Sequence, residues 1–491
     1  MEKQMFRIPG HQQRTFDTPI QVILASIAGL LLGLIAVTFK SSWILIGFLA
    51  ILMVILTVRR PELSVLTILL FLSTVIPDAR IPIINVGPGR LYITELIFLL
   101  LFVIFVVRWL TIPTVKVQHT PLDLPLLLFV FCAVITTIWS VLHNNVLLQH
   151  AIPELRVIFY YLLFFIVTNL ITEKKNIKLL LQGINWFATI VALGMIVQYM
   201  LGSSIPILEG RVEFLSDQSG ITRITDTPGE ALITLVVIIN LIRLLNGKLD
   251  KINYFDIIQL LLISTALIMT FNRTHWVMVI ISGLIAVIFI NWHNRKRILY
   301  WGIVLFFLIM AVVSFAVINP QTSIGKLLNS TFNRGLTILQ LDSYQENDQS
   351  TLRWRDFEYK YGFPQIAKHP LFGMGLGAEY RPRLYEIDHA NFNGQLFTHN
   401  AHLWLAIKTG LISYSFFMIF IIVFIWRGIH FWRKVEDIDL RNTLLGITIA
   451  MFATLIGANI HPFYMTLFWT PLIGVLIGVG ENIIRLEQKS V

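Results

Sequence analysis

Two histidines and an asparagine lie where a long polar segment meets an apolar run. His399, Asn400 and His402 follow the polar segment 319–398 directly, in the sequence Thr-His-Asn-Ala-His-Leu-Trp-Leu. An imidazole titrates near neutral pH and can accept the proton of a hydroxyl group, which makes His399 a candidate general base. A histidine at such a border is more often a hydrogen-bonded structural residue. No nearby acidic residue completes a zinc signature with His402.

Arginines near the ends of apolar runs form a second group. Arg211 and Arg223 lie in one join, Arg273 lies in a very short join, and Arg353 and Arg355 begin a predicted loop helix. A guanidinium group is planar, always charged and suited to phosphate oxygens, so this group favours a lipid-linked phosphate or pyrophosphate. Contact with lipid headgroups is the simpler alternative. It fits Arg211 and Arg355 slightly better and Arg223 equally well, whereas the join around Arg273 is too short to need a charge.

Two further patterns resemble motifs but lack their context. Asp437 and Asp439 have the spacing that holds the metal of a nucleotide sugar, but they lie in a charged join that we interpret as a solvated linker. Gly373, Gly375 and Gly377 follow no predicted strand and are therefore no dinucleotide fingerprint. We expect a backbone turn or an anion-binding nest there. The sequence contains no P-loop, which leaves ATP-driven transport unsupported.

The composition indicates which elements must position these residues. Of the 491 residues, 56% are hydrophobic and only 13% are charged, whereas soluble domains carry roughly 25% charged residues. These values predict an integral membrane protein with many spans. The single cysteine, Cys132, allows neither an intramolecular disulfide nor a cysteine metal site.

Apolar runs of about 20 residues predict membrane-spanning helices. We expect an all-α polytopic protein with about 12–14 transmembrane helices. Helices 1–11 lie in residues 1–318, a large extracytoplasmic loop covers 319–398, and helices 12–14 lie in 399–491. Within the loop, apolar residues at helical spacing predict a helix over Thr351–Lys368. The predicted spans are 19–38, 43–58, 62–76, 91–110, 122–142, 153–171, 177–201, 229–245, 254–271, 275–291, 298–318, 400–427, 441–459 and 462–484.

The distribution of lysine and arginine predicts the orientation. More than half of the 38 basic residues lie in every second join if the N-terminus is cytoplasmic, which is the positive-inside pattern. Both termini are then cytoplasmic and the loop 319–398 lies outside. The net charge of +10 follows this topology, so we expect no binding of nucleic acid.

In several short motifs the chain resembles the O-antigen ligase and polymerase superfamily, over roughly residues 120–480. Arg223 precedes a span, and Asn272-Arg273 is similar to the family's Ser-Arg at the outer end of a span. Asn272 in place of serine is a departure. The N-terminal spans, which look additional to the family's usual twelve, are another, and both put the subfamily in doubt.

Two further matches surround the end of the loop. The segment His369-Pro-Leu-Phe-Gly-Met-Gly-Leu-Gly resembles the family's loop motif His-Pro-x-x-Gly-x-Gly-x-Gly. His399-Asn400-x-x-Leu403, followed by Gly410, resembles the motif His-Asn-x-x-Leu and Gly that follows the loop. Each piece alone is weak, and their common order around one loop is what carries the resemblance.

The resemblance implies a metal-independent, GT-C-like glycosyltransferase without a cofactor, in the bacterial cytoplasmic membrane. Its partners would be an undecaprenyl-pyrophosphate-linked glycan donor, a glycan acceptor, membrane lipids, a flippase and a chain-length regulator. Carried over, Arg223 and Arg273, with Arg211 beside them, would hold the pyrophosphate, and His399 would activate the acceptor hydroxyl. Further substrate-binding candidates from the loop are Arg353, Asn400 and His402.

Three functions stay open at this stage. A polymerase would join the repeat units of a cell-surface polysaccharide, such as an O-antigen, an exopolysaccharide or teichuronic acid, and the extra N-terminal spans favour it. An O-antigen ligase would transfer the glycan to lipid A core. A polysaccharide or lipid transporter is the alternative from another class, but transporters carry ionisable residues at the bilayer midplane. Here deep charges are few, chiefly Glu95 and Lys408.

Overall fold

The computed structural model describes residues 51–491 apart from 74–75, 77–80, 87–88, 114–115, 203–210, 216–220, 226–228, 248–253, 291–294, 297–298, 300–301, 304–306, 308–309, 312–313, 315–317, 320–321, 337–350, 385–393 and 489–491. The chain forms two units, Met1–Arg59 and Arg60–Val491. In the first unit, residues 51–59 are helical, and the predicted span 19–38 lies outside the described residues. All of the candidate site residues belong to the second unit.

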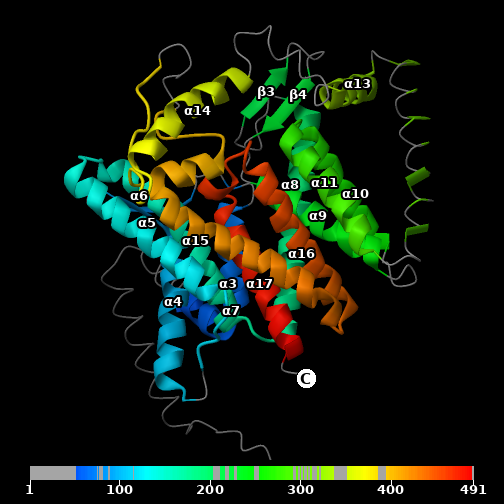
Figure 1. Cartoon of the computed structure of the whole chain (residues 1–491). Helices are drawn as coiled ribbons and strands as arrows, with labels where there is room; N and C mark the ends of the chain where they lie inside the picture. Colours follow the sequence, from blue (N-terminus) through cyan, green and yellow to red (C-terminus); the bar gives the residue numbers. More distant parts are fainter. Residues whose placement is uncertain are drawn as a thin grey trace, which may run out of the picture. The chain divides into compact units, whose positions relative to one another are not determined.

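Helices dominate the second unit (Figure 1). In the part of the chain that the structure describes, six helices are long and apolar enough to cross a membrane. The chain is therefore a polytopic, all-α membrane protein. The helices are α3 Pro61–Leu72, α4 Ile93–Thr111, α5 Asp123–His143, α6 Leu148–Phe159, α7 Leu163–Leu170, α8 Lys174–Leu201, α9 Glu230–Asn246, α10 Tyr254–Met269, α11 Arg273–Phe289, α13 Ser323–Leu336, α14 Thr351–Lys368, α15 Ala401–Phe431, α16 Ile438–Gly457 and α17 Thr470–Gln488.

Most predicted spans coincide with helices, with two corrections. The predicted span 462–484 is wrong at its start, because Phe463–Met465 forms a 3-10 turn and α17 begins only at Thr470. The following Pro471 suits a first helical turn, where no backbone donor is needed. The predicted span 153–171 starts too late, since the helical run begins at Leu148. The span 298–318 lies mostly outside the described residues, so the count of 12–14 stays a prediction.

Two small antiparallel hairpins lie in joins between helices. Strand β1 (Ile83–Val86) pairs with β2 (Gly89–Tyr92), and β3 (Arg211–Leu215) pairs with β4 (Ile221–Thr225). Residues 211–214 of β3 alternate polar and apolar, and β4 is rich in the β-branched residues isoleucine and threonine, both of which are typical of strands. The sequence analysis expected no strands in these joins.

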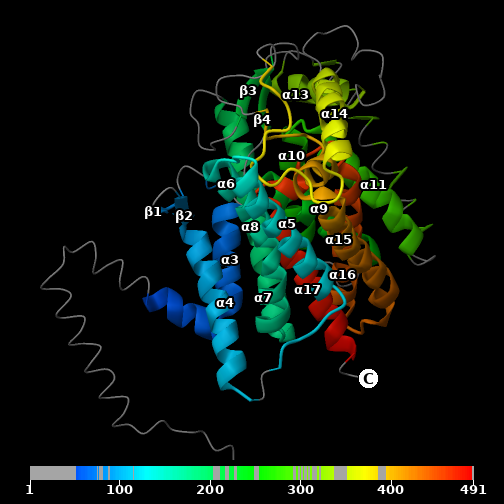
Figure 2. The ribbon, with the colours of Figure 1, turned by 60° about the vertical axis from the view of Figure 1, so that its left-hand side comes forward.

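Helix α9 is the centre of the second unit, and it is buried along most of its length. Helices α8, α10, α11 and α16 pack around it, while α15 packs on α5, α17 on α7 and α14 on α15. Helices α9, α11 and α15 begin at one end, which we call the loop end. Helix α14, the β3–β4 hairpin and α13 lie at this end in Figure 1 and again in Figure 2, and the C-terminus lies at the other.

Candidate active site at the start of helix α15

A buried carboxylate holds the imidazole of His399. Oε1 of Glu358 lies 2.6 Å from Nδ1 of His399, and Oε2 accepts the backbone N–H of His399 at 2.9 Å. The side chain of Glu358 is 1% exposed, whereas that of His399 is 28% exposed. A carboxylate accepts hydrogen bonds when it is ionised, so Nδ1 donates and Nε2 keeps its lone pair. Nε2 of a half-exposed histidine in this state can accept a proton.

Aromatic rings enclose the imidazole on two sides. The ring of Phe397 lies 5.1 Å from that of His399, and the ring of Trp354 lies 6.1 Å away, both edge-on. Trp354 is one helical turn before Glu358 on α14, so one face of this helix supplies both the ring and the carboxylate. The guanidinium of Arg381, which is 4% exposed, lies 6.0 Å above the Trp354 ring. Rotation of the imidazole is therefore restricted by its neighbours as well as by its hydrogen bond.

Helix α15 is broken at Gly410, and the segment after α14 fills the break. Gly410 has φ 75° and ψ 167° inside the helix. The exposed backbone groups are satisfied from outside, because Met374 N–H donates to Ile407 O at 2.9 Å and Leu411 N–H donates to Pro370 O at 2.8 Å. A Cβ on Gly410 would meet Leu371 O at 2.3 Å. The break thus holds the residues that directly follow α14, Pro370 and Met374, against α15.

The glycine segment does not form an anion nest. The amide of Gly375 donates to Lys408 O at 2.8 Å, and the amide of Gly377 donates to Oε2 of Glu154 at 2.6 Å. Both glycines have positive φ, which an L side chain rarely adopts. The motif is therefore a turn that docks on the membrane helices, and the alternative expectation of an anion nest is wrong.

The deep charges of the sequence are paired. Nζ of the fully buried Lys408 donates to Oε1 of Glu154 at 3.1 Å and to Ala378 O at 2.6 Å. Arg156 forms an ion pair with Glu95. A buried ion pair needs nearly all of its hydrogen bonds satisfied, and these pairs use theirs to fix the backbone. Charges that are paired in this way are not available to bind a transported ion or substrate, which weighs against a transporter.

A second polar cluster surrounds the residue before Arg273. Asn272 caps α11 by accepting the N–H of Thr274. Its amide donates to Oε1 of Glu230 at 2.9 Å and lies 3.4 Å from Nε2 of His461. Asn272 thereby fixes the start of α11, where Arg273 is the first helical residue and is half-buried.

The segment Ala458–His461 joins the two clusters. Ala401, two residues after His399, donates its N–H to Ala458 O at 2.8 Å. Arg355, three residues before Glu358, donates to Ile460 O at 3.2 Å. His461 at the end of the segment contacts Asn272. The starts of α11 and α15, which carry Arg273 and His399, therefore meet around one short turn, although they are far apart in the sequence.

The turn is electrically coupled to both clusters. Burial lowers the pKa of His461 well below its ordinary value, and electrostatic interactions with His275, His399 and Arg355 lower it further. Burial also lowers the pKa of Arg355, against the opposing effect of Glu358. His461 is consequently a neutral imidazole at physiological pH.

The other predicted arginines are placed only by their backbone. Arg211 pairs with Thr225 across the β3–β4 hairpin, and Arg223 pairs with Glu213. Strand β4 contacts α8 and α13. Arg353 lies in the first turn of α14. The side chains of these three arginines lie outside the described residues, so their roles stay predictions.

Two of the predicted substrate-binding residues have structural partners. The side-chain oxygen of Asn400 caps α15 by accepting the N–H of Leu403, and its amide donates to the Tyr359 hydroxyl at 3.1 Å. Nε2 of His402 lies 2.9 Å from Leu455 O, and its Nδ1 lies 3.1 Å from the Tyr414 hydroxyl. These contacts favour positioning roles over contact with substrate.

Sequence reasoning missed Glu358. It lies four residues after Trp354 and three before Tyr361, on the apolar stripe of the predicted helix. A carboxylate on a buried stripe requires a hydrogen-bonding partner, and this signal was available in the sequence. The identity of that partner could not be predicted, because His399 is 41 residues away in the sequence.

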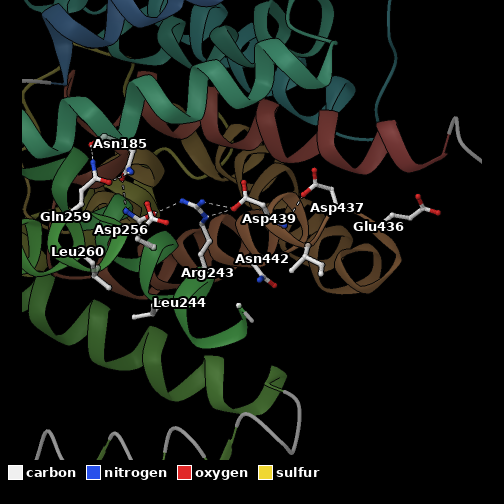
Figure 3. Close-up of a pocket in the computed structure, with 13 residues that line it drawn as sticks. Asn185, Arg243, Leu244, Asp256, Gln259, Leu260, Glu436, Asp437, Asp439 and Asn442 are labelled. Carbon is white, nitrogen blue, oxygen red and sulfur yellow. Dashed lines mark hydrogen bonds and ion pairs between the residues drawn. The ribbon is translucent and has the colours of Figure 1, made fainter. Parts of the chain in front are cut away.

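A pocket of about 510 Å³ lies away from His399. It is lined by Asn185 of α8, by the end of α9, by the first residues of α10 and by residues 436–442 around the start of α16 (Figure 3). Arg243 in this pocket is roughly 20 Å along α9 from Glu230, at 1.5 Å per residue. Several of its polar groups are already paired: Arg243 donates to Asp439 at 2.6 Å, and Asn185 donates to Gln259 at 2.6 Å. We therefore place no chemistry there.

Comparison with known proteins gives one family match. No curated protein matches the chain at a significant level. Residues 258–418 match the O-antigen ligase family. The matched range includes Arg273, Glu358 and His399 and excludes Arg223 and His461. The chain accordingly contains an O-antigen ligase family domain at residues 258–418.

Proposed function

We propose that this protein is a membrane glycosyltransferase that moves an oligosaccharide from undecaprenyl pyrophosphate to a sugar hydroxyl. The family match supports this class of reaction, because it implies lipid-linked glycan substrates. The product we favour is a lengthened lipid-linked chain, made by joining the repeat units of a cell-surface polysaccharide. Transfer to lipid A core is the alternative product.

The observation that carries the proposal is the contact between Glu358 and His399. The acceptor oxygen attacks the anomeric carbon, the bond from that carbon to the pyrophosphate oxygen breaks, and the lipid pyrophosphate leaves with the electron pair. Nε2 of His399 takes the hydroxyl proton, and Glu358 stabilises the imidazolium that forms. General base catalysis of this kind contributes typically about 10²–10⁴-fold in rate.

Arg273 is the cation that we assign to the pyrophosphate. It occupies the first turn of α11, which contains no acidic residue, and a helix N-terminus favours negative charge. An arginine there is unfavourable for the helix but strengthens an anion site. Arg223 and Arg211 join it in the proposal on the strength of the sequence pattern. Fixed cations of this kind stabilise the charge that develops on the leaving group.

The positive-inside pattern supports a site on the outer face of the cytoplasmic membrane, with both termini cytoplasmic. Lys174 and Lys178 form ion pairs with Asp437 at the end of the unit opposite the loop end. Arg243 lies at the same end. A cytoplasmic position for these basic residues leaves His399 and Arg273 outside.

The proposal is tested with purified protein in proteoliposomes and a lipid-linked oligosaccharide. We expect His399→Ala and Arg273→Gln to abolish most product, and the exposed surface variant His430→Ala to retain it. Gel analysis separates the products, because a polymerase lengthens the carrier-linked chain whereas a ligase needs added lipid A core. Product formation by His399→Ala at the wild-type rate would refute the assignment of the base.

A further inference from the structure

Three side chains that could bind a metal ion converge beside Arg273. Glu230 begins α9, His275 lies in the first turn of α11, and His461 lies in the turn before α17. One ligand atom from each lies within 4.8 Å of the other two. Glu230 is 4% exposed and His275 is 0% exposed. The sequence analysis expected no metal, because the resemblance implied a metal-independent enzyme, and these three residues are far apart in the chain.

The hydrogen bonds around His275 assign its tautomer. The hydroxyl of Thr234 donates to the backbone oxygen of Glu230 at 2.8 Å, as is common in helices. Its oxygen therefore accepts from Nδ1 of His275, at 2.5 Å. Nε2 then carries a lone pair and lies 3.5 Å from Oε1 of Glu230. Two acceptors face each other in a buried place, which requires a positive charge between them.

Two imidazole nitrogens of the cluster form no hydrogen bond to the part of the chain that the structure describes. Among the described residues, Nε2 of His275 and Nδ1 of His461 are buried and form no hydrogen bond. Buried polar nitrogens almost always have a partner, so two of them in one cluster suggest a ligand. The amide of Asn272, which donates to Oε1 of Glu230, holds that carboxylate in place, as supporting residues do around metal ligands.

Aromatic side chains cover part of the cluster. The ring of Phe463 lies 4.5 Å from that of His461 and 5.6 Å from that of His275. The ring of Trp469 lies 5.7 Å from that of His275, and both aromatic residues are buried. Exclusion of water strengthens the attraction between an ion and its ligands.

We propose that Glu230, His275 and His461 bind one divalent cation of the zinc class. Two imidazoles and one carboxylate are donors that Zn²⁺ prefers, with a fourth position left for water. Tetrahedral ligand atoms at 2.0–2.1 Å from zinc are about 3.3 Å from one another. The separation of 3.5 Å between Nε2 of His275 and Oε1 of Glu230 is close to that value.

The ion would connect α9, α11 and the turn before α17 at the start of α11, whose first residue is Arg273. Its role in the structure is to hold the start of α11 in place. The inference does not rest on the proposed transferase activity, because ion binding needs no glycan.

The test measures the metal bound to the full-length protein, which is purified through an affinity tag that contains no histidine. The protein in detergent is stripped with a chelator, dialysed against Zn²⁺ and analysed by mass spectrometry of the metal. We expect one Zn²⁺ per wild-type chain, and a loss of most of it in Glu230→Gln, His275→Gln and His461→Gln. His430→Gln, an exposed histidine outside the cluster, should retain the full amount.

A second measurement needs no variant. Loading the wild-type protein with Co²⁺ should give the intense visible bands of tetrahedral cobalt, and Zn²⁺ should displace them. Chelator should lower the Tm of the wild-type protein but not that of His461→Gln. A wild-type protein that elutes as a folded particle and takes up no more metal than the buffer control would overturn the proposal. Uptake by His461→Gln equal to that of wild type would do the same.

Discussion

The carboxylate of Glu358 contacts both the backbone N–H and Nδ1 of His399, at 2.9 and 2.6 Å. One side chain on α14 thus fixes the position and the tautomer of an imidazole at the start of α15. The loop helix is therefore part of the candidate active site, and its exposed side need not contact the substrate.

Glu358→Gln tests this role. A glutamine keeps the shape of the side chain, but its amide does not stabilise an imidazolium as a carboxylate does. We expect kcat to fall by roughly 10²–10⁴-fold, the usual contribution of a general base, with KM for the lipid-linked donor little changed. Asp356→Asn, on the exposed side of the same helix, is the matched control. A loss shared equally by both variants would indicate a general effect of charge on α14.

Gly375→Ala tests the docking of the glycine segment. Gly375 has φ +88°, and a Cβ would meet Oγ of Ser140 at 2.2 Å. Strain in this region of backbone space costs on the order of 1–3 kcal/mol, before any clash is counted. We expect a clear fall in Tm, and Ser140→Gly in the same chain should recover only the part caused by the clash. Gly335→Ala meets no atom within 4 Å and should leave the Tm nearly unchanged.

Lys408→Met tests the buried ion pair with Glu154. Removal of the ammonium leaves the carboxylate of Glu154 in a buried place without its counter-ion, which typically costs about 3–5 kcal/mol. The double variant Lys408→Met with Glu154→Gln removes both charges, so we expect it to be more stable than Lys408→Met alone. Thermal unfolding of wild type, the two single variants Lys408→Met and Glu154→Gln, and the double variant gives the coupling energy between the two side chains. Additive effects of the two substitutions would show that the pair contributes nothing.

Local patterns in the sequence were sufficient for the helices and for the end of the loop. The apolar spacing of Thr351–Lys368 predicted α14 at both ends, and the polar-to-apolar border at Asn400 predicted the start of α15. Contacts between distant segments were not predictable. The break at Gly410 exists because Pro370 and Leu371 supply partners for its backbone, and Glu230, His275 and His461 meet only through tertiary packing.

Asp437→Asn tests the ion pairs at the end of the unit opposite the loop end, through the pH dependence of the Tm. Burial raises the pKa of the Asp437 carboxyl, but hydrogen bonds from Lys178 and Lys174 outweigh burial and hold the pKa below its ordinary value. A carboxyl whose pKa is depressed in the folded state stabilises the fold above the unfolded pKa of about 3.9, and this stabilisation is lost as the pH falls through the folded value.

The variant separates this charge from the helix cap. Asp437 also caps α16 by accepting the N–H groups of Asp439 and Leu440, and asparagine caps a helix about as well as aspartate. At neutral pH we expect a lower Tm for Asp437→Asn than for wild type. The difference should shrink as the pH is lowered below about 4, where the carboxyl of the unfolded wild-type chain begins to take up a proton while that of the folded protein stays charged. Tm measured between neutral and acidic pH decides the matter, since a difference that stays constant over this range would mean that the ion pairs with Lys174 and Lys178 do not stabilise the fold.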